Sequence, residues 1–207
     1  MLRRTFLASG LSAGLLLRPG AGRAAEPYVD GSALFIRELA DKAIATLTDP
    51  GLDKAQRREK FRILFNESFA VQGIALHVLG RYRKRATDAE IAEYLRLFED
   101  VIVNTWADRF TDYAGQKFDV NDASPTESGS EKEKAALVRS TFYTDPTTPV
   151  DIEWRVNSNG SVYRITDIKV SGLSLVKTQQ DEFSSVIRAN GNQVSALIDK
   201  LRQMRDS

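Results

Sequence analysis

Alternating apolar and polar residues predict a small antiparallel sheet in the second half of the chain. In 151–156 every second residue is apolar and the others are charged, which is the pattern of a strand with one solvated face. A polar turn at 157–160 leads into the next strand. Two earlier strands are expected at 117–120 and 135–143. The polar residues 121–134 between them are expected to be an exposed loop that serves as a long hairpin connection.

The strand after the 157–160 turn breaks the alternation. Tyr163 and Ile165 share one parity, whereas Ile168 and Val170 share the other. A β-bulge near Asp167 would insert one residue and return both pairs to the same face. The alternative is that one of the two pairs faces outward.

Apolar residues at intervals of three and four predict helices both before and after the sheet in the chain. In the first half they are expected at 30–47, 53–65, 69–79 and 87–113. Two more follow Gly172, where the sheet is expected to end, around 183–187 and 194–201. The segment 69–79 is apolar on nearly all sides and is expected to be buried on most of them.

The helix that begins after Thr87 carries a long stripe of large apolar residues. Thr87, with Glu90 three positions later, forms a capping box that marks its start. The stripe continues through Phe98 to Tyr113. Because it is long and rich in large residues, we expect it to pack against a broad surface, which we interpret as the sheet within 150–187.

Together these elements predict an α+β fold. We expect a helical N-terminal half packed on a small antiparallel sheet of about four strands, with C-terminal helices, enclosing an apolar pocket. The residues expected to line it are Phe65, Phe69, Leu76, Leu79, Phe98, Ile102 and Trp106 from the helices, Ile152, Trp154, Ile165 and Val170 from the sheet, and Phe183 and Ile187 from the following helix. Each of these residues also fits an ordinary core role.

Residues 1–25 have the pattern of a cleavable export signal. Arg3 and Arg4 form a basic start, a mildly apolar run follows at 8–17, and small residues precede the expected cut. The run is shorter than the roughly 20 apolar residues that span a bilayer. The paired arginines resemble the twin-arginine export motif; an ordinary secretory signal and a retained anchor are the alternatives. Residues 26–207 are then a single domain in the periplasm.

Composition excludes several classes of site. The chain has 207 residues, no Cys and one His, so disulfides and thiolate metal sites are excluded. The net charge is +1, but the four arginines of 1–25 contribute to it; without them acidic residues outnumber basic ones by three. A slightly acidic domain does not favour a nucleic-acid partner.

The run 81–85 concentrates four cations, Arg81, Arg83, Lys84 and Arg85. Such a run is commonly a solvated loop. Its functional interpretation is a contact with an anionic group, either a lipid headgroup, a membrane surface or an acidic partner.

Candidate catalytic groups are few. His77 lies within the apolar segment 69–79 without an evident Asp or Ser partner, so a packed or hydrogen-bonded histidine is expected. Asp151, Glu153 and Asp167 are carboxylates on or near the sheet, where acid–base catalysts can occur. Because Asp151 and Glu153 fall on the charged, solvated face, no catalytic residue, metal or cofactor is expected.

Several blocks of sequence occur in an order and spacing that are specific in combination. They are Leu79–Tyr82 with Ala86 and Thr87, Phe98–Tyr113 with Gly115, Trp154 with Arg155, Tyr163–Ile168, Ser171–Leu175 and Gln180–Phe183. In these blocks the chain resembles the MlaC family of periplasmic phospholipid-binding proteins, also called toluene-tolerance auxiliary proteins. The segment 178–187 with Asn190 and Gly191 is similar to the hopanoid-associated branch, HpnM. Leu175 and Gln180 depart from that branch, where Met and Arg are expected.

The resemblance implies a lipid carrier with a deep apolar pocket. It implies that a phospholipid or a hopanoid is shuttled between an inner-membrane lipid transporter complex and an outer-membrane lipoprotein complex, by a monomer with transient membrane contact. A periplasmic adaptor without its own ligand, and an enzyme with a cone-shaped α+β fold, are the competing functions.

Overall fold

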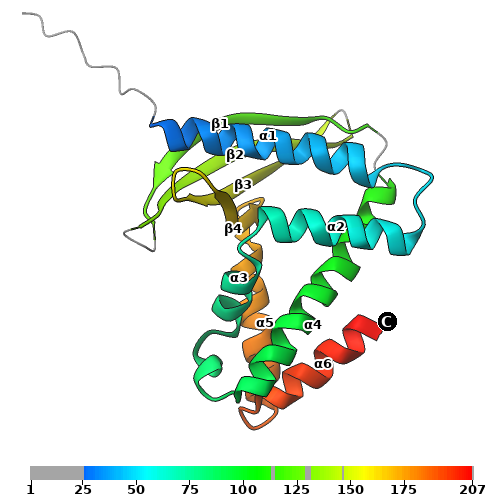
Figure 1. Ribbon diagram of the computed structural model, residues 1–207, viewed down its shortest axis with the longest axis vertical. Coiled ribbons are helices and arrows are strands. Elements are labelled where there is room, and N and C mark those ends of the chain that lie inside the picture. Colours follow the sequence, from blue (N-terminus) through cyan, green and yellow to red (C-terminus); the bar gives the residue numbers. More distant parts are fainter. Residues whose placement is uncertain (1–25, 113–114, 129–131, 146, 207) are drawn as a thin grey trace, which may run out of the picture.

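The computed structural model describes residues 26–112, 115–128, 132–145 and 147–206; the expected export signal 1–25 and Tyr113 lie outside them. In this part of the chain, five strands form one antiparallel sheet in chain order (Figure 1). They are β1 (Phe118–Thr126), β2 (Lys134–Asp145), β3 (Thr148–Ser158), β4 (Tyr163–Val170) and β5 (Leu173–Ser174). The helices are α1 (Pro27–Leu47), α2 (Lys54–Ser68), α3 (Val71–Leu79), α4 (Asp88–Ala107), α5 (Leu175–Ala189) and α6 (Val194–Asp206), with 3₁₀ turns η1 (Gly80–Lys84) and η2 (Asp108–Asp112). The predicted α+β fold is confirmed.

The sheet has one strand more than the predicted four. Gly172 does not end it, because Val170 pairs with Leu173 across a two-residue turn. Both turn residues, Ser171 and Gly172, have positive φ angles, 49° and 83°. This is the backbone that matches the twist of a tight hairpin.

One face of the sheet is apolar, because residues paired across neighbouring strands share a face. Val138 lies opposite Trp154, and Trp154 lies opposite Ile168. Ile152 lies opposite Val170 on the same face.

The opposite face carries a row of alternating charges. Arg139 pairs with Asp122 at 2.9 Å and approaches Glu153 at 4.0 Å, and Lys169 pairs with Glu153 at 2.7 Å. The row crosses four strands, so this face is solvated, as the alternation in 151–156 predicted.

The predicted bulge in β4 is confirmed. Arg155 pairs with Asp167 and Val156 with Ile165, which leaves Thr166 as the extra residue. Since one inserted residue reverses the parity, Ile168 returns to the face of Ile165. The alternative, in which one apolar pair faces solvent, is wrong.

The prediction that 121–134 is entirely loop is wrong for its first six residues, which extend β1. This strand lies at the edge of the sheet, where Pro125 is tolerated because no neighbour requires its missing N–H. A register shift between Val120 and Asp122 leaves Asn121 unpaired in the ladder. Its side chain instead donates a hydrogen bond to Thr141 at 2.9 Å.

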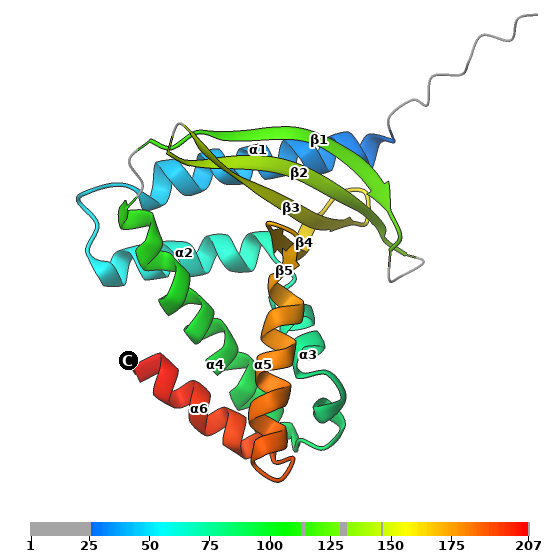
Figure 2. The same cartoon turned by 180° about the vertical axis from the view of Figure 1, so that it is seen from behind.

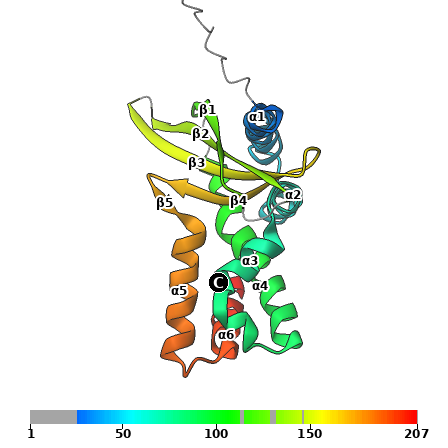
Figure 3. The same cartoon turned by 90° about the vertical axis from the view of Figure 1, so that its left-hand side faces the viewer.

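Helix α1 covers the apolar face of the sheet (Figures 1 and 3). Ala33 and Ile36 of α1 are buried against Val138, Val156 and Ile165 of the strands, and we call these five residues the sheet core. The face that the α4 stripe was expected to occupy is therefore filled by α1.

Helices α3, α4, α5 and α6 project away from the sheet (Figure 2). They enclose a second cluster, the helical core, whose buried members are Ala75, Val78, Leu79, Tyr82, Tyr94, Leu97, Phe98, Val101, Phe183, Ile187, Val194, Leu197, Ile198 and Leu201. The expectation that the stripe packs on the sheet is wrong: Phe98 instead meets Phe183 of α5 edge to face at 6.4 Å.

Helix α3 is less enclosed than its composition predicted. Ala75, Val78 and Leu79 are buried in the helical core, but Gln72 and His77 are exposed. In the described residues no helix is both long and apolar enough to cross a membrane.

Candidate functional site

The residues expected to line a pocket fall into three groups. Leu79, Phe98, Phe183 and Ile187 are buried in the helical core, with half-buried Ile102 against them. Ile165 is buried in the sheet core, with half-buried Phe69 and Trp154 against it. The third group lies outside both clusters. Phe65 is buried there, and four residues are half-buried: Leu76, Trp106, Ile152 and Val170. The expected single pocket wall is thus split: part of it lies in each of two separate cores and part lies outside both.

Helix α2 lies between these cores and carries a line of phenylalanines. Phe61 and Phe65 are one helical turn apart and stack with ring centroids 6.0 Å apart. Phe65 meets Phe69 at 4.8 Å, and Phe61 meets Phe110 of η2 at 6.0 Å. We call Phe110, Phe61, Phe65 and Phe69 the aromatic row.

The aromatic row reaches the sheet at Phe69. This residue follows α2 in an extended conformation and forms a bridge with Ile165 of β4. The next residue, Ala70, donates its N–H to the Ile165 carbonyl at 2.9 Å. The row is therefore continuous with the sheet core, and it follows the seam between the sheet and the projecting helices.

On the sheet side of the seam, large side chains remain partly exposed. Trp154 is half-buried and donates its indole N–H to the Ser140 hydroxyl at 2.8 Å. Ser140 is itself buried, at 1% exposure. Because this hydrogen bond satisfies the one polar atom of the indole, the ring offers an apolar surface to a neighbour.

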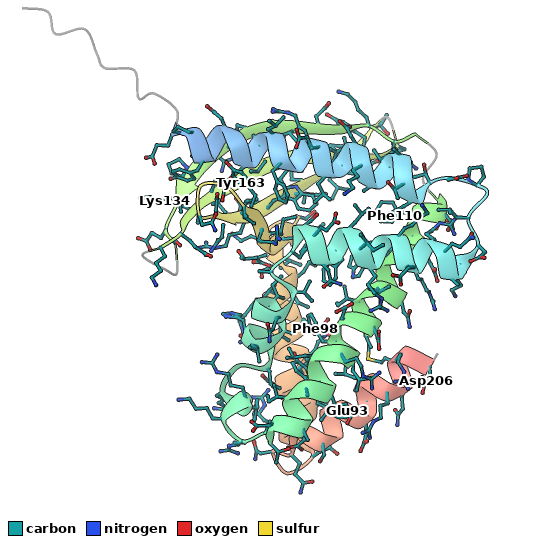
Figure 4. The ribbon with its side chains drawn as sticks, viewed as in Figure 1. Glu93, Phe98, Phe110, Lys134, Tyr163 and Asp206 are labelled. Carbon is teal, nitrogen blue, oxygen red and sulfur yellow. The ribbon has the colours of Figure 1, made fainter. Side chains whose placement is uncertain are left out.

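The predicted pocket wall did not include Phe61 and Phe110, which join the aromatic row, or Phe118 and Ile168, which pack on the sheet core. Phe118 packs edge to face on Trp154 at 6.3 Å, and Ile168 packs on the sheet core. A spacing of four, from Phe61 through Phe65 to Phe69, was the available signal, but it crosses a predicted helix boundary. In Figure 4, Phe98 lies among the projecting helices, whereas Tyr163 lies near α1.

Ion pairs join α2 to α4 beside the aromatic row. Arg62 contacts Glu99 at 2.7 Å and Asp100 at 2.9 Å. Burial opposes the charged form of Arg62, but its hydrogen bonds to both carboxylates raise its pKa on balance.

Asp108 lies at the start of η2, directly after α4. Its carboxylate forms ion pairs with Lys54 at 3.0 Å and with Arg58 at 3.1 Å. Partial burial acts to raise the pKa of Asp108, but hydrogen bonds from these two cations outweigh it and lower the pKa below its usual range.

The four cations expected to meet a headgroup or partner lie together on and just after η1. Arg81, Arg83, Lys84 and Arg85 are all exposed. Arg81 alone has a fixed orientation, since its guanidinium lies 5.1 Å from the ring centre of Tyr82. Within the described residues, none of the four makes an ion pair.

The candidate catalytic groups are not assembled into a site. The side chain of His77 is exposed, so the expectation of a packed histidine is wrong; α3 packs through its other faces. Asp167 accepts a hydrogen bond from the N–H of Val176 at 3.3 Å, and so supports the start of α5. Across the described ranges, no three acidic or His side chains lie close enough to hold a metal ion.

Surface hollows are present in the described part of the chain, and two of them involve residues considered above. One, of about 340 Å³, is lined by Gly80, Arg81, Gln180, Asp181, Ser184 and Arg188. The other, of about 380 Å³, lies over the charged row of the sheet and includes Asp122, Asp151 and Glu153. Among the residues expected to contact acyl chains, Ile152 alone lines either hollow.

This architecture matches a solved structure and a protein family. A solved structure of a phospholipid-binding protein from Ralstonia solanacearum, in complex with a phospholipid, matches with a TM-score of 0.70 at 21% sequence identity. The match covers 84% of this chain and 96% of that chain, and it shows a shared fold. The family model described as MlaC protein matches residues 37–203. Since residues 37–203 make up most of the chain, the chain belongs to the MlaC protein family.

Proposed function

We propose that this protein is a carrier of phospholipid and that it performs no catalysis. The observation that supports the proposal most directly is the shared fold with a protein solved in complex with a phospholipid. Family membership over 37–203 supports it independently. Residues 26–207 are the proposed carrier domain, exported to the periplasm by the signal at 1–25 through the twin-arginine route.

The acyl chains are proposed to lie along the seam between the two cores. The expected pocket residues that are half-buried are proposed to supply the apolar contact: Phe69, Leu76, Ile102, Trp106, Ile152, Trp154 and Val170, together with buried Phe65. Leu79, Phe98, Ile165, Phe183 and Ile187 are proposed to support this wall from within the cores. A carrier needs a surface that a ligand can cover, and fully buried residues do not provide one.

The energetics of acyl chains set the mechanism of release. Two long chains contain roughly 30 methylene groups at about 0.8 kcal/mol each. That sum exceeds the practical affinity limit of about 20 kcal/mol, so opening the seam must offset a large part of it. The remainder makes escape into water slow. Release is therefore proposed to require docking to a membrane or to a partner complex.

The proposed route is a shuttle between an inner-membrane lipid transporter complex and an outer-membrane lipoprotein complex, with transient membrane contact by a monomer. Arg81, Arg83, Lys84 and Arg85 are the proposed contacts for a headgroup or an acidic partner, since they are exposed and unpaired among the described residues.

A hopanoid is the alternative cargo. The similarity of 178–187, with Asn190 and Gly191, to the hopanoid-associated branch favours it. A rigid fused-ring lipid needs a broad cavity, whereas a phospholipid needs a forked one, so the two cargoes require different openings of the seam.

Native mass spectrometry of the purified protein tests the carrier function. We expect the added mass of one lipid, which tandem dissociation identifies as phospholipid or hopanoid. Ile152→Asp places a charge on the half-buried wall and is expected to lose the lipid while keeping its circular dichroism spectrum. Leu173→Asp is the matched control, because Leu173 is 71% exposed. A lipid-free wild-type protein would instead support the adaptor function.

Labelled-lipid transfer tests the release mechanism. Loaded protein in buffer is expected to keep its label for hours, and addition of acceptor vesicles is expected to remove it within minutes. Rapid loss into buffer alone contradicts a docking requirement.

A further inference from the structure

The smaller surface hollow lies at the far end of the helical core from the sheet, between η1 and α5. On α5 it is lined by Gln180, Asp181, Ser184 and Arg188. Gln180, Ser184 and Arg188 follow one another at intervals of four, and Asp181 lies next to Gln180 and three residues before Ser184, which places all four on one side of the helix. Gly80 and Arg81 complete the lining from the other side.

The charges and donors of this hollow favour an anion. The guanidinium groups of Arg81 and Arg188 enter no ion pair within the described residues. The one acid in the lining, Asp181, is bound to Lys177, which offsets its charge. Ser184 adds a hydroxyl that can donate to an oxyanion.

The hollow is also held in shape. Arg81 donates to the hydroxyl of Tyr82 at 3.2 Å and lies over its ring, and Tyr82 is buried in the helical core. Gln180 donates to the carbonyl of His77 at 2.9 Å, which ties α5 to the end of α3. A side chain at Gly80, where φ is 59°, would meet the Gln180 amide at 3.3 Å. Because Tyr82 holds Arg81 before a ligand arrives, the guanidinium of Arg81 loses less entropy on binding than that of an unrestrained side chain.

We propose that this hollow binds the phosphate group of a lipid headgroup, with Arg81 and Arg188 as charged donors and Ser184 as a neutral one. The neighbouring cations Arg83, Lys84 and Arg85 attract an anionic membrane surface to the same end of the molecule. The proposal rests on the proposed function for the source of the phosphate. It does not require acyl chains to occupy the seam.

Binding to vesicles and to inorganic phosphate tests the site. Co-sedimentation is measured with vesicles of phosphatidylcholine containing phosphatidylglycerol, and with phosphatidylcholine alone. In parallel, the arginine side-chain NMR signals are followed while inorganic phosphate is added. The site variant is Arg81→Gln with Arg188→Gln. The matched control is Arg83→Gln with Lys84→Gln, which removes the same charge from residues that do not line the hollow.

The site variant is expected to weaken binding to the anionic vesicles about tenfold, and the control about twofold. The Arg81 and Arg188 signals are expected to shift with phosphate in the wild type. Phosphate-induced shifts without vesicle binding would retain the phosphate site but assign it to a soluble phosphate. Equal losses in both variants, or no shifts with phosphate, would overturn the proposal.

Two further measurements keep the test independent of folding and of acyl-chain binding. Arg188→Gln alone leaves the Arg81–Tyr82 contact intact and is expected to weaken vesicle binding by a smaller factor. The lipid content of every variant is read by native mass spectrometry, so a failure of the carrier function is distinguishable from a failure of this site.

Discussion

Among single residues, Tyr94 shows how a polar atom within the helical core is satisfied by a hydrogen bond. Its side chain is fully buried, and its hydroxyl donates to the carbonyl of Ala75 at 2.8 Å, which joins α4 to α3. Burial raises the pKa of the Tyr94 hydroxyl far above its usual range. The folded state therefore favours the neutral form of this hydroxyl.

Tyr94→Phe is expected to lower the free energy of unfolding by about 1–2 kcal/mol at pH 7, because a buried carbonyl loses a partner. Since the pKa is raised in the folded state, the stabilisation of the neutral hydroxyl is complete below pH of about 10 and declines as the pH rises above that value. The variant should thus lose less stability than the wild type on going from pH 9 to pH 11. Urea titrations at these pH values measure it, with Tyr143→Phe on the sheet as the control.

Local signals of single residues were readable from the sequence, and long-range partners were not. The capping box of Thr87 and Glu90 is confirmed, because it depends on neighbours only three residues apart. The bond from Trp154 to Ser140 spans fourteen residues, and the side chain of His77 is exposed. Residue type and spacing carry no information about either.

Among the elements, the bulged strand β4 allows the clearest prediction, which concerns the effect of deleting one residue. Without Thr166, the sequence from Ile165 to Val170 alternates regularly, so deletion of Thr166 removes the bulge and keeps the register. Deletion of Lys169 instead makes Ile168 and Val170 consecutive, so the side chains from Val170 onward point to the opposite face of the sheet.

The Thr166 deletion is expected to fold with a loss of about 1–2 kcal/mol, since Thr166 hydrogen-bonds to Arg155 and Asn157. The Lys169 deletion is expected to unfold or to lose the β4–β5 hairpin. Thermal denaturation followed by circular dichroism distinguishes them. Equal stability of the two deletion variants would contradict the assigned bulge.

The bulge was predictable because parity is a property of one strand. The extent of β1 was not, because the polar composition of 121–126 describes a loop and an edge strand equally well. The pairing that decides between them comes from β2, and its register is set by residues distant in sequence.

At the scale of the whole molecule, ion pairs of α2 hold α4 and η2 beside the seam. Asp108 takes part with Lys54 and Arg58, and its pKa is lowered, although partial burial opposes the shift. Its contribution is therefore present above its unfolded pKa of about 4 and is lost as the pH falls through the lower folded value.

Asp108→Asn is expected to destabilise the protein by less than about 1 kcal/mol at neutral pH, because the carboxylate is partly solvated. The difference from the wild type should shrink below pH of about 4 and with added salt. Chemical denaturation at pH 7 and pH 3 measures it, with exposed Asp112→Asn as the control. A difference that persists at pH 3 would assign the effect to packing.

The fold class was predictable from the order of the elements, but the partner of the α4 stripe was not. Amphipathic patterns identify which face of a helix is buried and leave open what buries it. Both α1 and α4 present suitable faces, and the choice of α1 for the sheet depends on how Ala33 and Ile36 fit beside Val138. For this reason the expected pocket residues were divided between two cores.

The helical core also has a consequence for the order of folding. It combines α3 and α4 with α5 and α6, so the sheet lies between its two contributing stretches in the chain. During synthesis the apolar stripe of α4 can meet α3, but it lacks its partners in α5 and α6 until residues as far as Leu201 have been made. A chain in this condition leaves the apolar surface around Phe98 incompletely covered, and such partly folded chains are prone to aggregation.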